Sequence, residues 1–196
     1  MFIQTERLIL REIKAEDWLP VLAYQLTPQY LKYTHWDTRD ERDVKDFIGM
    51  FINWQGEKPR RKFQLAITKA SNGDLIGNCG IRKQDPGDRV AELGYEIAPF
   101  EWKKGYATEA ARAMVAFAFL TLKTQRVWAY CIADNIASAR VLEKIGMHQE
   151  RLQPQQEWLK GAWWDVVYYG ISEEEWKQER FKKPYSSLDL HGSVEP

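Results

Sequence analysis

The stretch "EWKKGYATEAAR", from Glu101 to Arg112, places a single glycine, Gly105, after two lysines and before an alanine-rich run. The first turn of a helix has backbone N–H groups without an internal partner and carries a partial positive charge. A glycine at that point lets an anion, usually a phosphate, approach the backbone closely. Taken alone, the segment is only a weak indication of an anion site at a helix start, because glycines that merely turn the chain are more common there. A glycine that only turns the chain is the alternative interpretation.

The sequence gives little support for a nucleotide-binding loop, a metal site, a disulfide or a catalytic nucleophile. The chain has neither a G-x-x-x-x-G-K-[ST] loop nor a G-x-G-x-x-G dinucleotide fingerprint. Cys79 and Cys131 lie in separate strand-like runs, with no C-x-x-C and no paired histidine spacing. We therefore expect buried, reduced thiols and no metal site or disulfide. A G-x-S-x-G elbow and a Cys/His pair are also absent, so no nucleophilic side chain is indicated.

Hydrophobic periodicity predicts one mixed α/β domain. The order of elements is β-α-α-β-β-β-α-β-α-β, which is typical of helices packed around one sheet. Asp17 is a plausible helix start, and Gly146 is a typical helix stop. We expect strands over 7–13, 62–70, 74–83, 90–100, 125–133 and 162–172, and helices over 14–26, 38–55, 105–122 and 135–147.

Length and composition narrow the class of protein. The 196 residues, 44% apolar and 29% charged, suit one globular domain with a core. The 28 basic and 28 acidic side chains argue against a nucleic-acid binder with a broad basic face. No stretch is long enough to span a membrane, and the start does not read as a signal peptide, so a cytoplasmic protein is expected. We expect the domain to cover residues 1–176 and a polar tail to cover 177–196.

Two further segments lead to a family. "DNIASARVLEKIGM" combines an amide, a hydroxyl three residues later and a helix ended by glycine, and "GYEIAPFEWKKGYATEAARAMVAFAF" precedes it. With the opening "TERLILREI" and the closing "WWDVVYYGI", the region from about Thr5 to Ile171 resembles the GNAT acyl-CoA N-acetyltransferase superfamily. Specifically, it is similar to the branch of ribosomal-protein alanine N-acetyltransferases, RimJ and RimL. The resemblance implies the GNAT fold, a single mixed, largely antiparallel, splayed central sheet flanked by helices.

The resemblance also implies a coenzyme site for acetyl-CoA and no metal. The family pattern Q/R-x-x-G-x-G/A falls on residues 102–107, with Trp102 where the superfamily usually has Gln or Arg. Gly105 is expected to let backbone N–H groups hold the pyrophosphate, with modest attraction from the preceding lysines. Asn135 is expected to hold the pantetheine arm. The other implied coenzyme-binding residues are Tyr95 and Ile97 through their backbone, and Lys103, Lys104, Tyr106, Ala107 and Thr108 in the turn.

The family reaction is direct attack of an amine on the thioester. It needs a base, donors for the oxyanion and a proton for the departing thiolate. The resemblance implies Glu92 as the base and Ser138 as the proton donor, with Glu96 or a water as the alternative base. The spacing of four puts both glutamates on one strand face unless a bulge intervenes, as the family fold has here. Ser138 would lie in the first turn of a helix capped by Asn135, so a capping network is its alternative role.

The implied acceptor is a primary amine, and a protein N-terminal α-amine of the ribosomal-protein type is the first expectation. A small amine such as an antibiotic, a polyamine or an amino acid is the alternative, and a non-catalytic acyl-CoA sensor is an alternative of another class. A monomer or homodimer without a membrane or direct nucleic-acid partner is expected. Core packing is favoured over an aromatic acceptor groove for the tryptophans Trp18, Trp36, Trp54, Trp128, Trp163 and Trp164.

Overall fold

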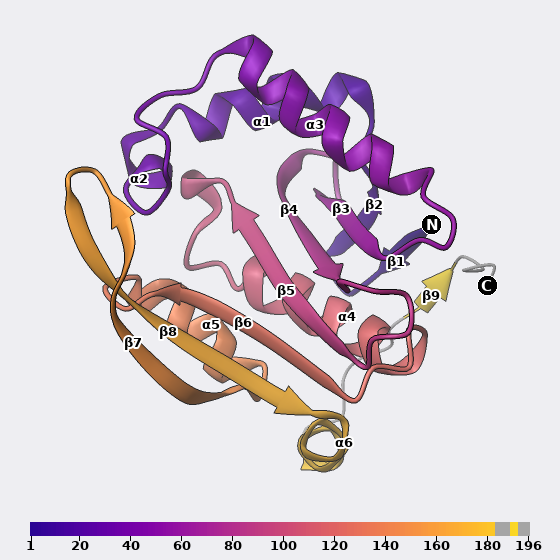
Figure 1. The fold of residues 1–196 in the computed structure, drawn as a ribbon. Helices are drawn as coiled ribbons and strands as arrows, with labels where there is room; N and C mark the ends of the chain where they lie inside the picture. Colours follow the sequence, from indigo (N-terminus) through magenta and orange to yellow (C-terminus); the bar gives the residue numbers. More distant parts are fainter. Residues whose placement is uncertain (183–188, 192–196) are drawn as a thin grey trace.

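The computed structural model describes residues 1–182 and 189–191, shown in Figure 1. The helices are α1 (Trp18–Gln25), α2 (Pro28–Leu31), α3 (Glu41–Gln55), α4 (Tyr106–Leu120), α5 (Ile136–Lys144) and α6 (Glu173–Lys182), with 3₁₀ turns η1 (Ala15–Asp17) and η2 (Pro99–Glu101). The strands are β1 (Phe2–Gln4), β2 (Leu8–Glu12), β3 (Lys62–Lys69), β4 (Leu75–Arg82), β5 (Val90–Ile97), β6 (Arg126–Ile132), β7 (His148–Leu159), β8 (Ala162–Ser172) and β9 (Asp189–His191).

The strands form one sheet in the order β7-β8-β6-β5-β4-β3-β2-β1-β9. Neighbouring strands run antiparallel, except that β5 and β6 are parallel. A parallel pair needs a crossover connection, and α4 supplies it. The predicted mixed, largely antiparallel sheet flanked by helices is confirmed.

The sheet splays between β5 and β6. These strands pair only from Val90 opposite Arg126 to Glu92 opposite Trp128, although β5 continues to Ile97 and β6 to Ile132. Beyond that point β5 pairs with β4, and β6 pairs with β8. Figure 1 shows the two strands moving apart toward their carboxyl ends. The splay leaves an open backbone edge on each strand.

The helices cover the two faces of the sheet unequally. On one face, α4 packs closely because its inward side chains include the fully buried Ala110, Ala111 and Ala113, and α5 lies beside it (Figure 1). On the other face, α1 and α3 cover the half of the sheet formed by β2 to β4, around Val21, Ile48 and Ala66. In the part of the chain that the structure describes, no helix covers this face over β6 and β8.

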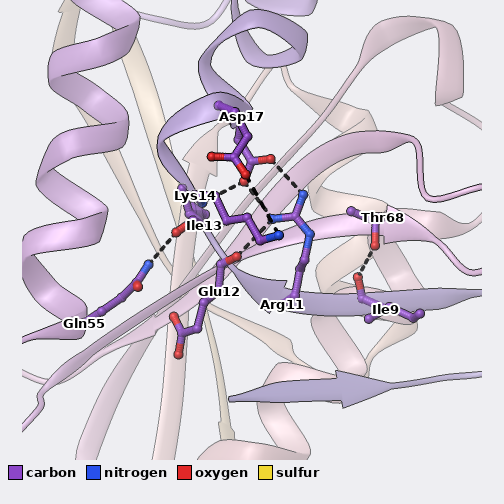
Figure 2. A network of polar contacts seen from close by, with 9 residues as sticks. Ile9, Arg11, Glu12, Ile13, Lys14, Asp17, Gln55 and Thr68 are labelled. Carbon is purple, nitrogen blue, oxygen red and sulfur yellow. Dashed lines mark hydrogen bonds and ion pairs between the residues drawn. The ribbon is translucent and has the colours of Figure 1, made fainter.

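A polar network ties α1 and α3 to β2 (Figure 2). The buried Asp17 carboxylate accepts hydrogen bonds from both terminal nitrogens of Arg11 at 2.7 Å and from the Lys14 backbone N–H at 2.8 Å. The Asp17 hydrogen bond raises the pKa of Arg11. Gln55 at the end of α3 donates to the Ile13 carbonyl at 2.8 Å. Asp17 does precede α1, as predicted, but its side chain binds Arg11 and does not cap α1.

Three features differ from the sequence-based expectations or extend them. The strand β7 was not expected, and it pairs with β8 to form the C-terminal hairpin. The bulge expected in β5 is absent, because residues 92–97 pair with residues 77–82 of β4 in continuous register. Within the expected tail, α6 runs past Trp176 to Lys182, and β9 pairs with β1. Residues 183–188 and 192–196 of that tail lie outside the described residues, so the boundary at 176 stays a prediction.

Candidate active site

The turn before α4 has the backbone conformation of an anion-binding loop. Lys103 and Gly105 both have positive φ, at 64° and 86°, and α4 begins at Tyr106. Gly105 occupies the N-cap position and offers no side chain to satisfy the first N–H groups of the helix. The turn is exposed from Trp102 to Gly105. This geometry is compatible with an anion at the turn, and phosphate binding there stays a prediction.

The two lysines of the turn have different surroundings. Lys104 pairs with the buried Glu101 at 2.8 Å, and Glu101 also pairs with Lys69 at 3.2 Å. The Lys104 hydrogen bond lowers the pKa of Glu101, which stays ionised. Lys103 has no ion pair with any described residue. Its charge, more than that of Lys104, is available to an incoming phosphate.

The open edge of β5 presents backbone groups to the splay. Ala98 donates its N–H to Ile76 of β4, and successive residues of a strand direct their polar groups to opposite edges. Ile97 and Tyr95 therefore direct theirs away from β4, toward the gap. The indole N–H of Trp102 donates to the Ile97 carbonyl at 2.7 Å, so Trp102 braces the end of this edge.

Tyr95, Ser138 and Asn135 meet across the splay. The Asn135 side-chain oxygen accepts from the Ser138 backbone N–H at 3.2 Å, which caps α5. The Ser138 hydroxyl lies 2.9 Å from the Tyr95 hydroxyl, which also reaches the Ser138 carbonyl at 3.1 Å. Burial raises the pKa of Tyr95, so the phenol stays protonated. Asn135 and Ser138 thus have the capping contact that was their alternative role, and the Ser138 hydroxyl in addition meets Tyr95.

Glu92 lies at the point where the splay begins. Its carboxylate pairs with Arg82 of β4 at 3.0 Å and is 29% exposed. Burial, followed by the charge of Glu92, raises the pKa of Tyr130 on β6. Arg82 occupies one oxygen of Glu92, and the other oxygen remains able to accept a proton or a hydrogen bond.

Glu96 has a more closed environment than Glu92. Its Oε1 accepts from Tyr24 at 2.5 Å, Gln25 at 3.0 Å and Asn78 at 2.6 Å, and its Oε2 accepts from Tyr30 at 2.5 Å. Burial, followed by the Glu96 charge, raises the pKa of both tyrosines. Neutral donors thus hold this carboxylate in place, and no described residue forms an ion pair with it.

The predicted site residues fall on two faces of β5. Glu92 and Glu96 share the face of Asn78 and Arg82, which are their register partners on β4. Tyr95 lies on the opposite face and packs in the core with α4 and α5. The site is therefore reached from both faces of the splay. Sequence reasoning missed the Tyr95 side chain and Arg82, although strand alternation from Glu92 predicts that residue 95 faces the other way.

The tryptophan interpretation holds only in part. Trp18 and Trp54 are partly buried and pack against the cluster under α1 and α3, and Trp164 packs against Ile132, Leu159 and Val166. None of the six residues expected mainly in the core is buried, and Trp36, Trp163 and the additional Trp158 are 38%, 56% and 55% exposed. Trp128 and Trp164 are partly buried on the uncovered face of β6 and β8. Trp176 is the fully buried tryptophan, and it packs against Phe119. Aromatic surface is therefore available beside the splay.

The thiols do not supply a nucleophile. Cys79 and Cys131 are both buried and reduced, as predicted. Burial raises the pKa of Cys79 to about 12 and that of Cys131 to about 11, so both are thiols near neutral pH. Among the described residues there is no group of three metal-binding side chains and no helix long and apolar enough to cross a membrane.

Comparison with known proteins gives the family. A model of the acetyltransferase (GNAT) domain matches residues 7–148. The chain belongs to the GNAT acetyltransferase family. The match begins at Arg7 of the opening motif and ends just past α5, so it includes the turn at Gly105, the β5 edge and the pair Asn135–Ser138.

Relatives of this acetyltransferase resemble it over about nine tenths of its chain. The chain is 34% identical over 176 residues to YnaD, an uncharacterized N-acetyltransferase of Bacillus subtilis, covering 90% of this chain and 99% of that protein. A GNAT-family acetyltransferase structure from Bacillus anthracis superposes with a TM-score of 0.78 at 31% identity, covering 89% and 99% of the two chains. RimL, a ribosomal-protein α-N-acetyltransferase solved with coenzyme A, superposes at 0.76 with 18% identity, covering 88% and 98%. At that identity the likeness to RimL concerns the fold.

Proposed function

We propose that this acetyltransferase moves an acetyl group directly from acetyl-CoA to the α-amine of a protein N-terminus. One arrangement carries the proposal: a carboxylate and a hydroxyl pair face the same splay from opposite sides of β5. Glu92 lies on one side, and the Tyr95–Ser138 pair lies on the other. A proton can therefore leave the amine on one side while a proton reaches the thiolate on the other.

The coenzyme side of this proposal assigns a role to each predicted residue. Backbone N–H groups from Lys103 to Thr108 hold the pyrophosphate, because Gly105 keeps the turn open. Polar groups of Tyr95 and Ile97 on the open edge of β5 pair with the pantetheine amides, as an added strand would. The Asn135 side-chain oxygen is used by the cap, which leaves its NH₂ group to donate to the pantetheine arm.

The chemical step can be balanced with the residues at the splay. The amine loses a proton to Glu92, directly or through water, and its nitrogen forms a bond to the thioester carbonyl carbon. The carbon–sulfur bond breaks as the oxyanion collapses. The thiolate takes a proton from Ser138, whose hydroxyl is hydrogen-bonded to the protonated Tyr95. Ser138 then regains a proton from solvent, and Glu92 releases to solvent the proton that it took from the amine. Glu92 is preferred over Glu96 as the base because the Glu92 carboxylate accepts a hydrogen bond from one side chain, whereas the Glu96 carboxylate accepts hydrogen bonds from four.

The acceptor is assigned because the proposed base is a carboxylate and not a histidine. An α-amine titrates near 7.7–8.0, so roughly a tenth of it is neutral at pH 7, whereas a lysine near 10.4 is neutral in only about one molecule in a few thousand. A carboxylate partly engaged by Arg82 suits the α-amine. The name of RimL supports the same acceptor class, and with it the RimJ/RimL branch.

The test measures thiol release from acetyl-CoA with a panel of amines. Short peptides beginning with Ala or Ser should react at the α-amine, and the same peptides blocked at the N-terminus but carrying lysine should not. A small amine, such as a polyamine, an aminoglycoside or a free amino acid, reacting at least about tenfold faster would replace the peptide assignment. Binding of acetyl-CoA without thiol release for any amine would instead indicate a sensor.

A further inference from the structure

A hollow lies on the uncovered face of β6, β8 and β7. Its volume is about 440 Å³, and Arg126, Trp128, Glu150, Arg151 and Tyr168 line it. Trp128, Tyr130 and Tyr168 form one aromatic cluster, with ring centroids 5.9–6.2 Å apart and planes within 22–32° of each other. Trp128 is the register partner of Glu92, so this cluster starts where the proposed base lies.

A bulge in β7 directs an arginine into the hollow. The register between β7 and β8 shifts between Gln149 and Arg151, which leaves Glu150 as the extra residue. A bulge of this kind lets two consecutive side chains lie on the same face, and both Glu150 and Arg151 line the hollow. The Glu150 carboxylate lies close to Gly170: a Cβ atom added to Gly170 would be 2.1 Å from Glu150 Oε1. The glycine therefore makes room for the bulge.

Arg151 differs from the other arginines of this surface in having no acidic partner. Arg126 pairs with Glu150, and Arg82 pairs with Glu92. The Arg151 guanidinium lies 4.3 Å from the centre of the Tyr168 ring and forms no ion pair with any described residue. Stacking on a tyrosine fixes the guanidinium plane and leaves its N–H edges free for a carboxylate.

On the other side of the splay, the segment between α2 and α3 contacts the β7–β8 hairpin. At the tip of the β7–β8 hairpin, Lys160 pairs with Asp37 at 2.9 Å, and His35 lies 3.6 Å from Glu157. Tyr33 donates to the Asp134 carbonyl at 2.9 Å. The segment between α2 and α3 thus bridges to the hairpin and to the start of α5. The open face of the sheet leads from Glu92 over Tyr168 toward Arg151.

We propose that this hollow binds an acidic N-terminal peptide, in which a carboxylate within the first four residues pairs with Arg151. This inference rests on the proposed function. Tyr130 is opposite Tyr168, and Tyr168 is opposite Arg151, so two strand spacings of about 4.8 Å separate Tyr130 from Arg151. An extended peptide spans about 3.3–3.6 Å per residue. A side chain at the third or fourth position therefore reaches the guanidinium while the α-amine lies at the splay.

The experiment compares two peptides that differ in one charge, Ser-Ala-Glu-Gly and Ser-Ala-Gln-Gly with amidated C-termini. The wild-type enzyme should acetylate the glutamate peptide with a kcat/KM about tenfold higher, the size of one charge-assisted hydrogen bond. The variant Arg151→Gln should lose this preference, Arg151→Lys should keep part of it, and added salt should reduce it. Arg42→Gln, an exposed change on α3, is the matched control and should keep the preference.

Binding of the same peptides to the enzyme with coenzyme A, followed by tryptophan fluorescence, separates the two proposals. Arg151-dependent binding of the glutamate peptide without turnover would retain the hollow as the peptide site and overturn the N-terminal acceptor. Equal acetylation of both peptides, unchanged in Arg151→Gln, would overturn the acidic-peptide site and leave the acceptor proposal standing. Neither binding nor turnover would overturn both.

Discussion

Arg7 and Glu109 join the start of β2 to the first turn of α4. The Glu109 carboxylate accepts from the Arg7 backbone N–H at 2.8 Å and from Nε at 2.7 Å, and Nη2 lies 2.6 Å away. The Arg7 guanidinium also donates to the Lys104 carbonyl at 3.0 Å and lies 4.8 Å from the centre of the Tyr106 ring. The opening motif of the chain therefore holds the proposed pyrophosphate turn in its left-handed conformation.

Breaking this pair should weaken coenzyme binding. We expect Arg7→Met and Glu109→Gln each to raise the KM for acetyl-CoA by about three- to tenfold, because a hydrogen bond to a charged group contributes about 1.5–3 kcal/mol and part of it orders the turn. The KM for the peptide should change little. Glu41→Gln, which removes an exposed pair with Lys45 on α3, is the control and should leave both KM values unchanged.

Substitution of Gly105 tests the turn itself. Gly105→Ala should weaken acetyl-CoA binding moderately, because φ is 86° and a Cβ would lie 3.3 Å from the Arg7 guanidinium. Gly105→Asp should abolish binding, since a carboxylate adds repulsion at the anion site. Gly73→Asp, at another left-handed glycine with φ of 77° and open space around it, controls for strain. Calorimetric titration with acetyl-CoA that shows equal affinity for Gly105→Asp and the parent would place the phosphate site elsewhere.

The hydroxyl pair should affect turnover more than binding. Ser138→Ala and Tyr95→Phe should lower kcat by about tenfold or more with little change in the KM for acetyl-CoA, if Ser138 protonates the thiolate. The backbone cap of α5 should survive both changes, because Asn135 bonds the Ser138 N–H and not its hydroxyl. An unchanged kcat in steady-state assays of Ser138→Ala would return that residue to a capping role.

Substitution of Glu92 should mainly affect kcat, and substitution of Glu96 should mainly affect the melting temperature. Glu92→Gln should lower kcat by about a hundredfold with a small change in melting temperature, because the Glu92–Arg82 pair is partly exposed. Glu96→Gln should lower the melting temperature by several degrees, because an amide NH₂ would face the donors that the carboxylate now accepts. A large rate loss in Glu96→Gln at an unchanged melting temperature would make Glu96 the base.

The cysteines should be slow to alkylate in the folded protein. The rise of the Cys131 pKa from 9.0 to about 11 lowers its thiolate population near pH 8 by about a hundredfold, and Cys79 is affected more strongly. Iodoacetamide at pH 8, followed by intact mass, should leave both unmodified over times that fully modify the urea-unfolded chain. Rapid single modification of the native enzyme would show an exposed thiolate and complicate the assignment of direct transfer.

Local signals in the sequence explain which elements could be predicted. The helix after Gly105 has apolar residues at every third or fourth position, and β3 to β5 lie between turn-forming residues, so both were visible. The strand β7 was not, because ten of its twelve residues are exposed on both faces and show no alternation. The strand β7 forms because it pairs with β8, and a local sequence pattern does not predict that pairing.

Contacts within the site were less accessible to sequence reasoning. Gly105, Asn135 and Ser138 could be named because motif spacing marks them. The partners of Glu92 and Glu96 come from β4, α1 and α2, and depend on strand register. The partial exposure of Trp128 and Trp164 could not be predicted, because it depends on which half of the sheet the helices leave uncovered. That is a property of the assembled fold.

The splay also has a consequence for the order in which the chain is made. Beyond Trp128, β6 has β8 as its sheet partner, because β5 has already turned away. A nascent chain synthesised only as far as α5 therefore exposes both backbone edges of residues 129–132, the kind of unpaired strand that promotes aggregation. Translation must reach β8 before one of those edges is paired, and the other edge stays open at the splay. A protein truncated before β8 would therefore leave the β6 side of the splay without the strand that supports it.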